Sequence, residues 1–318
     1  MRILSLDGGG VYGISSARIL EEIEKKTGKR ISDIFDLMVG TSIGAVQVAL
    51  LNKPSPKERK PFYTAENVKK LIKDTSQKIF SAGSWQRVIS LNGWSRALYS
   101  DDQKEALFDE ILGNYKMRDG LKHMILTSYD AQEEKPYLIN NFNVSQENWR
   151  VSKILNVATN IPGVFKPTAF IEGDIKKYLI DGGFVFMDPT LLALIKADEL
   201  YPDADKILIS IGSGHTTINE NIQESDLETY KDMMDILDNA LSFGNPNCID
   251  EFMNVFLSRG TFKLKKYYRL DPVYPKDIGS FSDASDANVA KITSSAEGFI
   301  ENNKETFQRI SADLKSTH

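Results

Sequence analysis

FDLMVGTSIGAVQVALL, residues 35–51, is the stretch that decides the fold of this chain. Residues 35–39 form a mainly apolar run typical of a buried strand, and residues 45–51 have the apolar character of a buried helix. The segment between them, GTSIG at 40–44, predicts a sharp turn from strand to helix, which strains the backbone at Ser42 and exposes its hydroxyl at the carboxyl end of the sheet. Ser42 is therefore a candidate nucleophile. A helix-capping serine in a Gly/Ser turn is the structural alternative.

A second strand–turn–helix unit precedes this one. Residues 3–6 are a short apolar run that stops at Asp7, and apolar residues then recur with helical spacing from Ile14 until Gly28 closes the segment. Two such units in succession predict an α/β fold with a largely parallel sheet. Later apolar runs predict strands near 124–129, 136–139, 178–180 and 207–211, and helical patterns cover 65–80, 102–113, 223–241, 247–258 and 284–315.

The turn after the first strand is DGGGVYG, residues 7–13, in which Gly8, Gly10 and Gly13 form a G-x-G-x-x-G pattern. Consecutive glycines allow backbone N–H groups to converge on one point, because no Cβ blocks the approach. Such a loop holds either a phosphate or the oxyanion of an ester's tetrahedral intermediate. The same pattern binds dinucleotides, and Asp33 or Asp36 lies near the position of a ribose-binding acid. A dinucleotide-binding oxidoreductase is therefore the first alternative function.

A third motif, Asp181-Gly182-Gly183, follows the predicted strand at 178–180. Its carboxylate is expected at the carboxyl edge of the sheet, on a strand parallel to the one that precedes Ser42. A nucleotide-binding fold explains neither this aspartate nor the serine turn, whereas an acyl hydrolase uses a nucleophile, oxyanion donors and a base. The alternative for Asp181 is a turn aspartate bonded to backbone N–H groups.

Histidine is scarce in this chain. His215 follows the predicted strand at 207–211, where the base of a catalytic triad could lie, but Asp181 already fills the role of base. No Cys or His cluster has the spacing of metal ligands, so neither a metal nor another cofactor is expected. A serine–aspartate dyad requires burial to raise the pKa of the aspartate until it accepts the serine proton.

The composition of the 318 residues is that of a globular protein, with 41% hydrophobic and 26% charged residues and a formal charge of -5. The weak acidity argues against nucleic-acid binding, and the single cysteine, Cys248, excludes an intrachain disulfide. The absence of a signal-peptide pattern and of long apolar runs predicts a cytoplasmic protein that contacts membranes peripherally. We expect one domain over 1–318, with helical insertions at about 53–115 and a helical part at about 223–318.

Three segments, DGGGVYG, FDLMVGTSIGA and DGGFVFMDP, resemble patatin-like phospholipases in their order and spacing. IPGVFKP at 161–167, ILISIGSG at 207–214 and SDASDANVAKI at 282–292 extend the resemblance over nearly the whole chain. The resemblance implies a three-layer α/β/α sandwich and metal-free hydrolysis of acyl esters in phospholipids or lysophospholipids. It also leaves two alternatives open: a non-catalytic lipid-binding relative, and an enzyme switched on by a partner or a small signal.

Carried over residue by residue, the resemblance makes Ser42 the nucleophile and Asp181 the general base. The backbone N–H groups of Gly8, Gly9 and Gly10 would form the oxyanion hole, and the N–H of Ile43 is a further donor on physical grounds. The remaining motif glycines, which support these turns, are Gly13, Gly40, Gly44, Gly182 and Gly183.

The chain departs from the family pattern in places, and Val157 and Asn160 partly replace the small residues expected before Pro162. Tyr12 stands where the family usually has Arg or Lys, and Met187-Asp188-Pro189 replaces an Asn-Asn-Pro segment. The change to Met187-Asp188-Pro189 is expected to be tolerated, because Asp caps a helix about as well as Asn. Residues 80–99, which include Trp85 and Trp94, are either a lid or membrane-contact segment or an insertion packed on the core.

Overall fold

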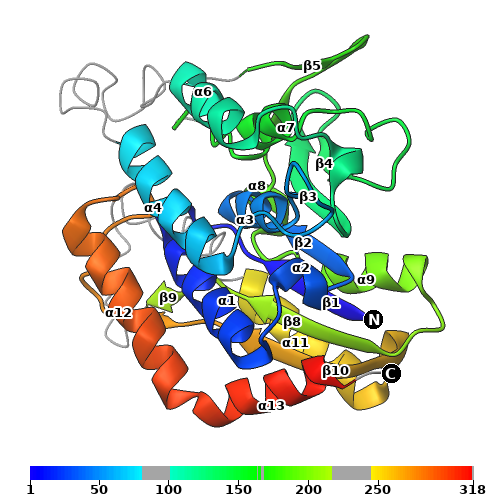
Figure 1. Cartoon of the computed structure of the whole chain (residues 1–318), viewed down its shortest axis with the longest axis vertical. Coiled ribbons are helices and arrows are strands. Elements are labelled where there is room, and N and C mark those ends of the chain that lie inside the picture. The colour runs from blue at the N-terminus through cyan, green and yellow to red at the C-terminus, as the bar shows by residue number, and fades with distance from the viewer. Residues whose placement is uncertain (81–100, 163, 166–167, 217–244, 317–318) are drawn as a thin grey trace, which may run out of the picture.

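The structure is a computed structural model that describes residues 1–80, 101–162, 164–165, 168–216 and 245–316 (Figure 1). The predicted helix at 223–241 and nearly all of the tryptophan-containing segment at 80–99 lie outside these residues.

The main sheet is mostly parallel and has the strand order β10-β8-β1-β2-β3-β4, with β7 also paired to β3. The first five strands in this order run parallel, whereas β4 and β7 are antiparallel to β3. The strands are β1 (Arg2–Leu6), β2 (Leu37–Gly40), β3 (His123–Asp130), β4 (Lys135–Asn140), β7 (Leu179–Asp181), β8 (Lys206–Ile211) and β10 (Leu264–Leu270).

The direction of β7 corrects the prediction that Asp181 ends a parallel strand. Strand β2 pairs with β3 as far as Leu126, and β7 pairs with β3 at Ser128–Asp130. Strand β4 occupies the opposite edge of β3 along this length. β7 therefore lies on the same edge as β2 and runs toward it, so that the carboxyl ends of the two strands face each other.

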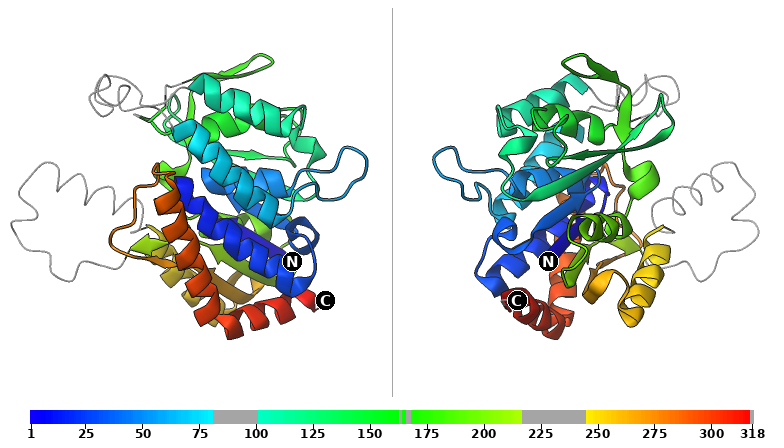
Figure 2. Two further views of the ribbon diagram at one scale, coloured as in Figure 1. Left: turned by 60° about the vertical axis from the view of Figure 1, so that its left-hand side comes forward. Right: turned by 90° about the vertical axis from the view of Figure 1, so that its right-hand side faces the viewer.

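Helices cover both faces of the sheet (Figures 1 and 2). Alternate strand residues divide between two cores, as expected for a sheet that is buried on both faces. Leu4 and Met38 belong to the larger cluster, with helices α1, α3, α4, α12 and α13, whereas Ile3 and Leu37 belong to the smaller cluster, with α9 and α11. The predicted three-layer α/β/α sandwich is confirmed.

The helices are α1 (Gly13–Thr27), α2 (Ile31–Ile34), α3 (Ile43–Leu51), α4 (Ala65–Phe80), α6 (Asp101–Leu112), α7 (Val151–Ala158), α8 (Gly183–Phe186), α9 (Thr190–Leu200), α11 (Asn245–Arg259), α12 (Asp286–Asn302) and α13 (Lys304–Lys315). Short 3-10 helices occupy Gly10–Tyr12, Met117–Asp119 and Thr261–Lys263. The predicted helix at 284–315 is two helices that meet at Asn303.

Several elements were not predicted. Strand β10 carries Lys265, Lys266 and Arg269, so its charges hide the apolar run that marks the other strands. Helix α7 was also missed, whereas only the start of α9, after Asp188, was expected. The remaining small strands are β5 (Phe170–Glu172) paired with β6 (Ile175–Lys177), and β9 (His215–Thr216) paired with β11 (Val273–Tyr274).

The two ends of the described chain lie close together (Figures 1 and 2). The Arg2 guanidinium donates to the carbonyl of Ser316 at 2.6 Å. The last helix therefore closes against the start of the first strand. No described helix is both long enough and apolar enough to cross a bilayer.

Candidate active site

Ser42 lies at the turn between β2 and α3, and its backbone has φ 53° and ψ -119°. A positive φ is unfavourable for a residue with a Cβ, and it is typical of strained turns at functional sites. Glycines allow the turn, because a Cβ on Gly40 would lie 2.4 Å from the Gly44 carbonyl and a Cβ on Gly44 only 2.3 Å from the carbonyl oxygen of Leu6. The Ser42 hydroxyl makes no capping bond to α3, so the helix-cap alternative is wrong.

The hydroxyl of Ser42 instead donates to Oδ2 of Asp181 at 2.6 Å. The two side chains meet because β2 and β7 point toward each other along the same edge of β3. The other carboxylate oxygen, Oδ1, accepts the N–H of Gly183 at 2.7 Å, which fixes the orientation of the carboxylate. Both side chains are almost fully buried. Ser42 and Asp181, both expected at the carboxyl edge of the sheet, therefore lie within hydrogen-bonding distance of each other.

The electrostatic surroundings of Asp181 favour a role as a base. Burial raises the pKa of its carboxyl group to about 6, although the hydrogen bonds from Ser42 and Gly183 and the charge of Lys104 oppose this rise. At neutral pH the carboxyl group is therefore mainly ionised, and it is a stronger base than a solvent-exposed aspartate.

The glycine loop lies beside this pair. A Cβ on Gly8 would lie 3.4 Å from the Cβ of Ser42, and Gly9 and Gly10 have φ values of 145° and 55°. The N–H of Gly8 already donates to Met187 O at 3.0 Å, so it is not available to an oxyanion in this conformation. Among the described residues, the N–H groups of Gly9, Gly10 and Ile43 have no acceptor.

The dinucleotide alternative fails on the position of its acidic residue. A dinucleotide site needs that residue at the carboxyl end of the second strand. Asp36 instead precedes β2, and its carboxylate accepts the N–H of Arg2 at the start of β1. Asp33 lies in α2, before the same strand. Both acids are therefore at the opposite end of the sheet from the glycine loop.

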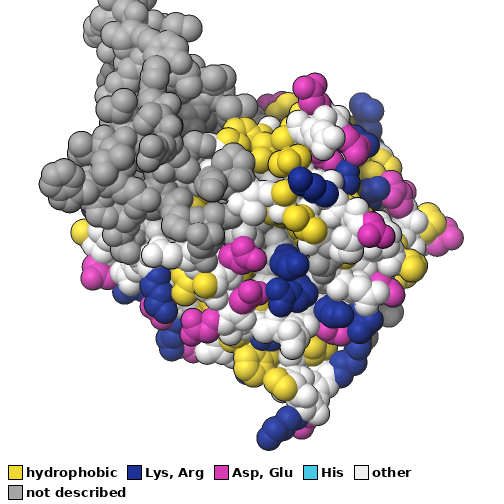
Figure 3. Space-filling model, turned by 90° about the horizontal axis from the view of Figure 1, so that it is seen from above, with side chains coloured by type: hydrophobic (Ala, Val, Ile, Leu, Met, Phe, Trp, Pro, Cys, Tyr) yellow, Lys and Arg dark blue, Asp and Glu magenta, His cyan; other side chains and the backbone are white. Residues whose placement is uncertain are grey.

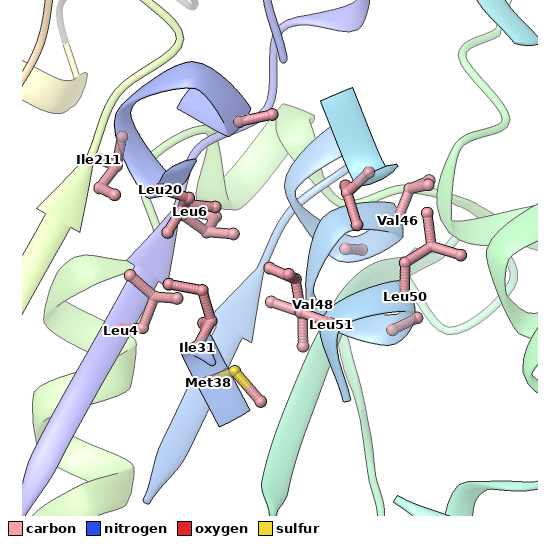
Figure 4. Packing of buried hydrophobic residues seen from close by; sticks show 14 of the residues in the cluster. Leu4, Leu6, Leu20, Ile31, Met38, Val46, Val48, Leu50, Leu51 and Ile211 are labelled. Carbon is pink, nitrogen blue, oxygen red and sulfur yellow. The ribbon is translucent and has the colours of Figure 1, made fainter. Parts of the chain in front are cut away.

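An apolar cavity extends from Ser42 and Gly10 into the helical layer and is open to solvent at its mouth. Its inner wall is one side of α3, with Val46 and Leu50. In Figure 4 these two side chains lie on the opposite side of α3 from Val48 and Leu51, which point toward the sheet. Helices α4, α6 and α7 and two phenylalanines complete the lining: Leu71, Ile72, Phe108, Leu112, Leu155, Phe165 and Phe281.

Lys104 is a cavity residue that the sequence did not reveal. It lies in α6 and is 1% exposed, and its ammonium group donates to Asn156 O at 2.8 Å, at the carboxyl end of α7. The same group lies 4.0 Å from the centre of the Phe165 ring. An isolated lysine in a charged, amphipathic helix gives no sequence signal for such a position, since most such lysines are exposed.

His215, the alternative base, and Tyr12, the departure from the family pattern, both bond to residues other than Ser42 and Asp181. His215 pairs through Nδ1 with Asp271 at 3.0 Å, and no hydrogen bond joins it to Ser42 in the described structure. The Tyr12 hydroxyl donates to Gly279 O at 2.5 Å, and its ring packs on Tyr274. Tyr12 is thus a packing residue of the loop.

The fold and this site define an α/β protein with a strained serine turn, a buried aspartate partner and an adjoining apolar cavity. A family model described as "Patatin-like phospholipase" matches residues 4–194. The chain belongs to the patatin-like phospholipase family.

Similar proteins are known from plants. The chain is 31% identical to "Patatin-like protein 4" of Arabidopsis thaliana over 67% of its own length and 59% of that protein. It is 24% identical over 96% of its length to "Probable inactive patatin-3-Kuras 1" of Solanum tuberosum, and covers 89% of that protein. The chain covers 59% and 54% of the length of the first two relatives that it matches, which is little more than half. Among solved structures, VipD from Legionella pneumophila aligns with 95% of this chain and 66% of its own, at 10% identity and a TM-score of 0.43.

Proposed function

We propose that this protein is a lipid acyl hydrolase of the phospholipase A or lysophospholipase type, with Ser42 as nucleophile and Asp181 as base. The observation that carries the proposal is the 2.6 Å bond from the Ser42 hydroxyl to the buried carboxylate of Asp181, at the mouth of an apolar cavity. A buried base and an apolar acyl pocket are what the hydrolysis of a lipid ester requires.

In the first half of the reaction, Asp181 takes the hydroxyl proton while Ser42 Oγ bonds to the ester carbonyl carbon. The carbonyl oxygen becomes an oxyanion that the N–H groups of Gly9, Gly10 and Ile43 stabilise, because these donors are available beside Ser42. The ester C–O bond then breaks, and the leaving alkoxide takes the proton from Asp181. The product is an acyl group on Ser42, with its chain in the cavity.

In the second half, water gives a proton to Asp181 and attacks the acyl carbon. Collapse of the second tetrahedral intermediate releases the fatty acid and returns the proton to Ser42. Every step uses groups of the chain and water, so the proposed reaction needs no cofactor.

Phospholipid substrates lie in a membrane, so we also propose that the protein binds bilayers peripherally. On the face seen in Figure 3, the described side chains mix hydrophobic residues with charges of both signs, without a large patch of one sign. This face therefore offers no large patch of one sign for purely electrostatic attraction to a bilayer. Co-sedimentation with zwitterionic and with anionic vesicles tests this proposal, and no binding to either would contradict it.

The main test is incubation with mixed phospholipids and lysophospholipids, followed by mass spectrometry of the released fatty acids. We expect release by the wild type, none by Ser42→Ala, and labelling of Ser42 alone by a fluorophosphonate. Ser32→Ala is the matched control, because Ser32 is equally buried and lies in α2. An active Ser42→Ala variant would refute the proposal, and lipid binding without release would support the non-catalytic alternative.

A further inference from the structure

A largely buried arginine on the edge strand β10 connects the two halves of the proposed site. Arg269 lies in β10, and its side chain is 14% exposed. Its two terminal nitrogens donate to the two carboxylate oxygens of Asp7, at 3.1 and 2.7 Å. Nη1 also lies 3.2 Å from Oδ2 of Asp188 and donates to Ser210 Oγ at 2.7 Å.

The two carboxylates that Arg269 holds flank one backbone hydrogen bond. Asp7 immediately precedes Gly8, and Asp188 immediately follows Met187. The N–H of Gly8 donates to Met187 O at 3.0 Å. Asp7 begins the glycine loop, and Asp188 ends the segment that starts at Asp181. One guanidinium group therefore ties the loop with the oxyanion donors to the segment with the base.

A third contact of Arg269 reaches the other side of the loop. Its Nη2 lies 3.5 Å from Oδ2 of Asp271, and Oδ1 of Asp271 accepts the N–H of Gly214. Ser213, the residue before Gly214, packs closely against the glycine loop. A Cβ added to Gly9 would lie 2.6 Å from the Cβ of Ser213. The backbone on both sides of the glycine loop thus depends on the same cation.

Resting on the proposed function, we infer that Arg269 is a positioning residue: through Asp7 and Asp188 it holds the oxyanion loop in register with Ser42 and Asp181. Oxyanion donors act only when they are held within about 0.5 Å of their working geometry. The planar guanidinium fork bonds both oxygens of Asp7 and lies against Asp188, and a lysine ammonium group lacks this fixed bidentate geometry. No charge of the opposite sign other than Arg269 contacts Asp7 in the described structure.

The test compares Arg269→Lys with Lys206→Arg. Lys206 is a fully buried cation that pairs with Asp198 at 2.8 Å and makes no contact with the glycine loop in the described structure. We expect Arg269→Lys to lower kcat by about tenfold to a hundredfold, less than the full loss of an oxyanion donor. KM should remain unchanged, because the cavity is untouched. The rate of Ser42 labelling by a fluorophosphonate should fall by the same factor. Lys206→Arg should change none of these.

Two further measurements separate a positioning role of Arg269 from an effect on stability alone. If Arg269 acts through Asp7, the losses of kcat in Arg269→Lys and Asp7→Asn are not additive in the double variant. Backbone hydrogen exchange of residues 7–13 should accelerate in Arg269→Lys and Asp7→Asn but not in Lys206→Arg, and this is measurable without any catalytic activity. Should Arg269→Lys fail to fold, Asp7→Asn alone is compared with Lys206→Arg.

The outcomes are distinct. A lower melting temperature with unchanged kcat per labelled site, or unchanged exchange in residues 7–13, would overturn the positioning role. An inactive wild type whose Ser42 resists labelling would refute the proposed function, while the exchange data would still decide whether Arg269 holds the loop.

Discussion

Asp181 combines the two properties that a base in a dyad needs, burial and a fixed partner. Its pKa of about 6 lies above the ordinary value of 3.8 because the carboxyl group is buried. The native state therefore binds this proton more tightly than the unfolded state does, and stability falls as pH rises between these two values. Above pH 6 the ionised group lowers the free energy of unfolding by about 3 kcal/mol, the equivalent of the shift.

We predict that Asp181→Asn abolishes lipid hydrolysis yet stabilises the fold at neutral pH. An amide cannot take the serine proton, but it also carries no buried charge. In urea unfolding, the gain in stability over the wild type should be greatest above pH 7 and should shrink as pH falls toward 4.

Asp130 on β3 provides a control, because the pKa of its carboxyl group is shifted in the opposite direction. Burial raises the pKa of this carboxyl group, but its bonds to Lys177 and to the N–H groups of Glu133 and Gln132 outweigh burial and hold the pKa below its usual value. Asp130→Asn should therefore destabilise the protein at pH 7. Equal effects of Asp181→Asn and Asp130→Asn on the free energy of unfolding would show that burial does not set the pKa of Asp181.

At the scale of elements, helix α3 has two roles. Its start presents Ser42, its sheet-facing side packs against the strands, and its other side lines the cavity. A helix that is apolar on all sides is expected where both sides are covered. In this protein one side of α3 packs against the sheet, and the other side lines the proposed acyl pocket.

Leu50 and Leu51 separate these two roles. Both are almost fully buried, but only Leu50 lines the cavity. We predict that Leu50→Ala and Leu51→Ala each lower the free energy of unfolding by about 2–5 kcal/mol. Only Leu50→Ala should shift the preference among acyl chain lengths, measured with a series of p-nitrophenyl esters, because it alone enlarges the cavity. A shift of the same size in Leu51→Ala would show that the cavity does not hold the acyl chain.

At the scale of the whole molecule, the two hydrophobic clusters share the same strands. Leu4 and Ile3 are neighbours in β1, but they point into opposite clusters. Neither cluster can lose its packing while the sheet between them stays intact, so we expect one domain rather than two.

We therefore predict a single cooperative transition in calorimetry, with equal calorimetric and van't Hoff enthalpies. Leu4→Ala and Ile3→Ala should lower the melting temperature of that same transition. Two transitions, each moved by only one of the substitutions, would indicate two independently folding units.

The sequence by itself determined the parts of this protein that depend on local backbone geometry. GTSIG and DGGG specify their turns because glycine permits the close approaches at Gly40 and Gly44 and the positive φ values of Gly9 and Gly10. The strand–turn–helix order then predicts the parallel sheet, and the motifs at its strand ends make Ser42, Asp181 and the glycine loop the candidate site.

Only the tertiary structure decided the direction of β7, the engagement of the Gly8 N–H, and the places of Lys104 and Arg269. A three-residue strand is too short for its pattern to show which way it pairs, and a basic residue looks the same in sequence whether it is solvated or buried. These features depend on contacts between segments far apart in the chain, as between Arg269 and Asp7, and packing of the whole molecule brings such segments together.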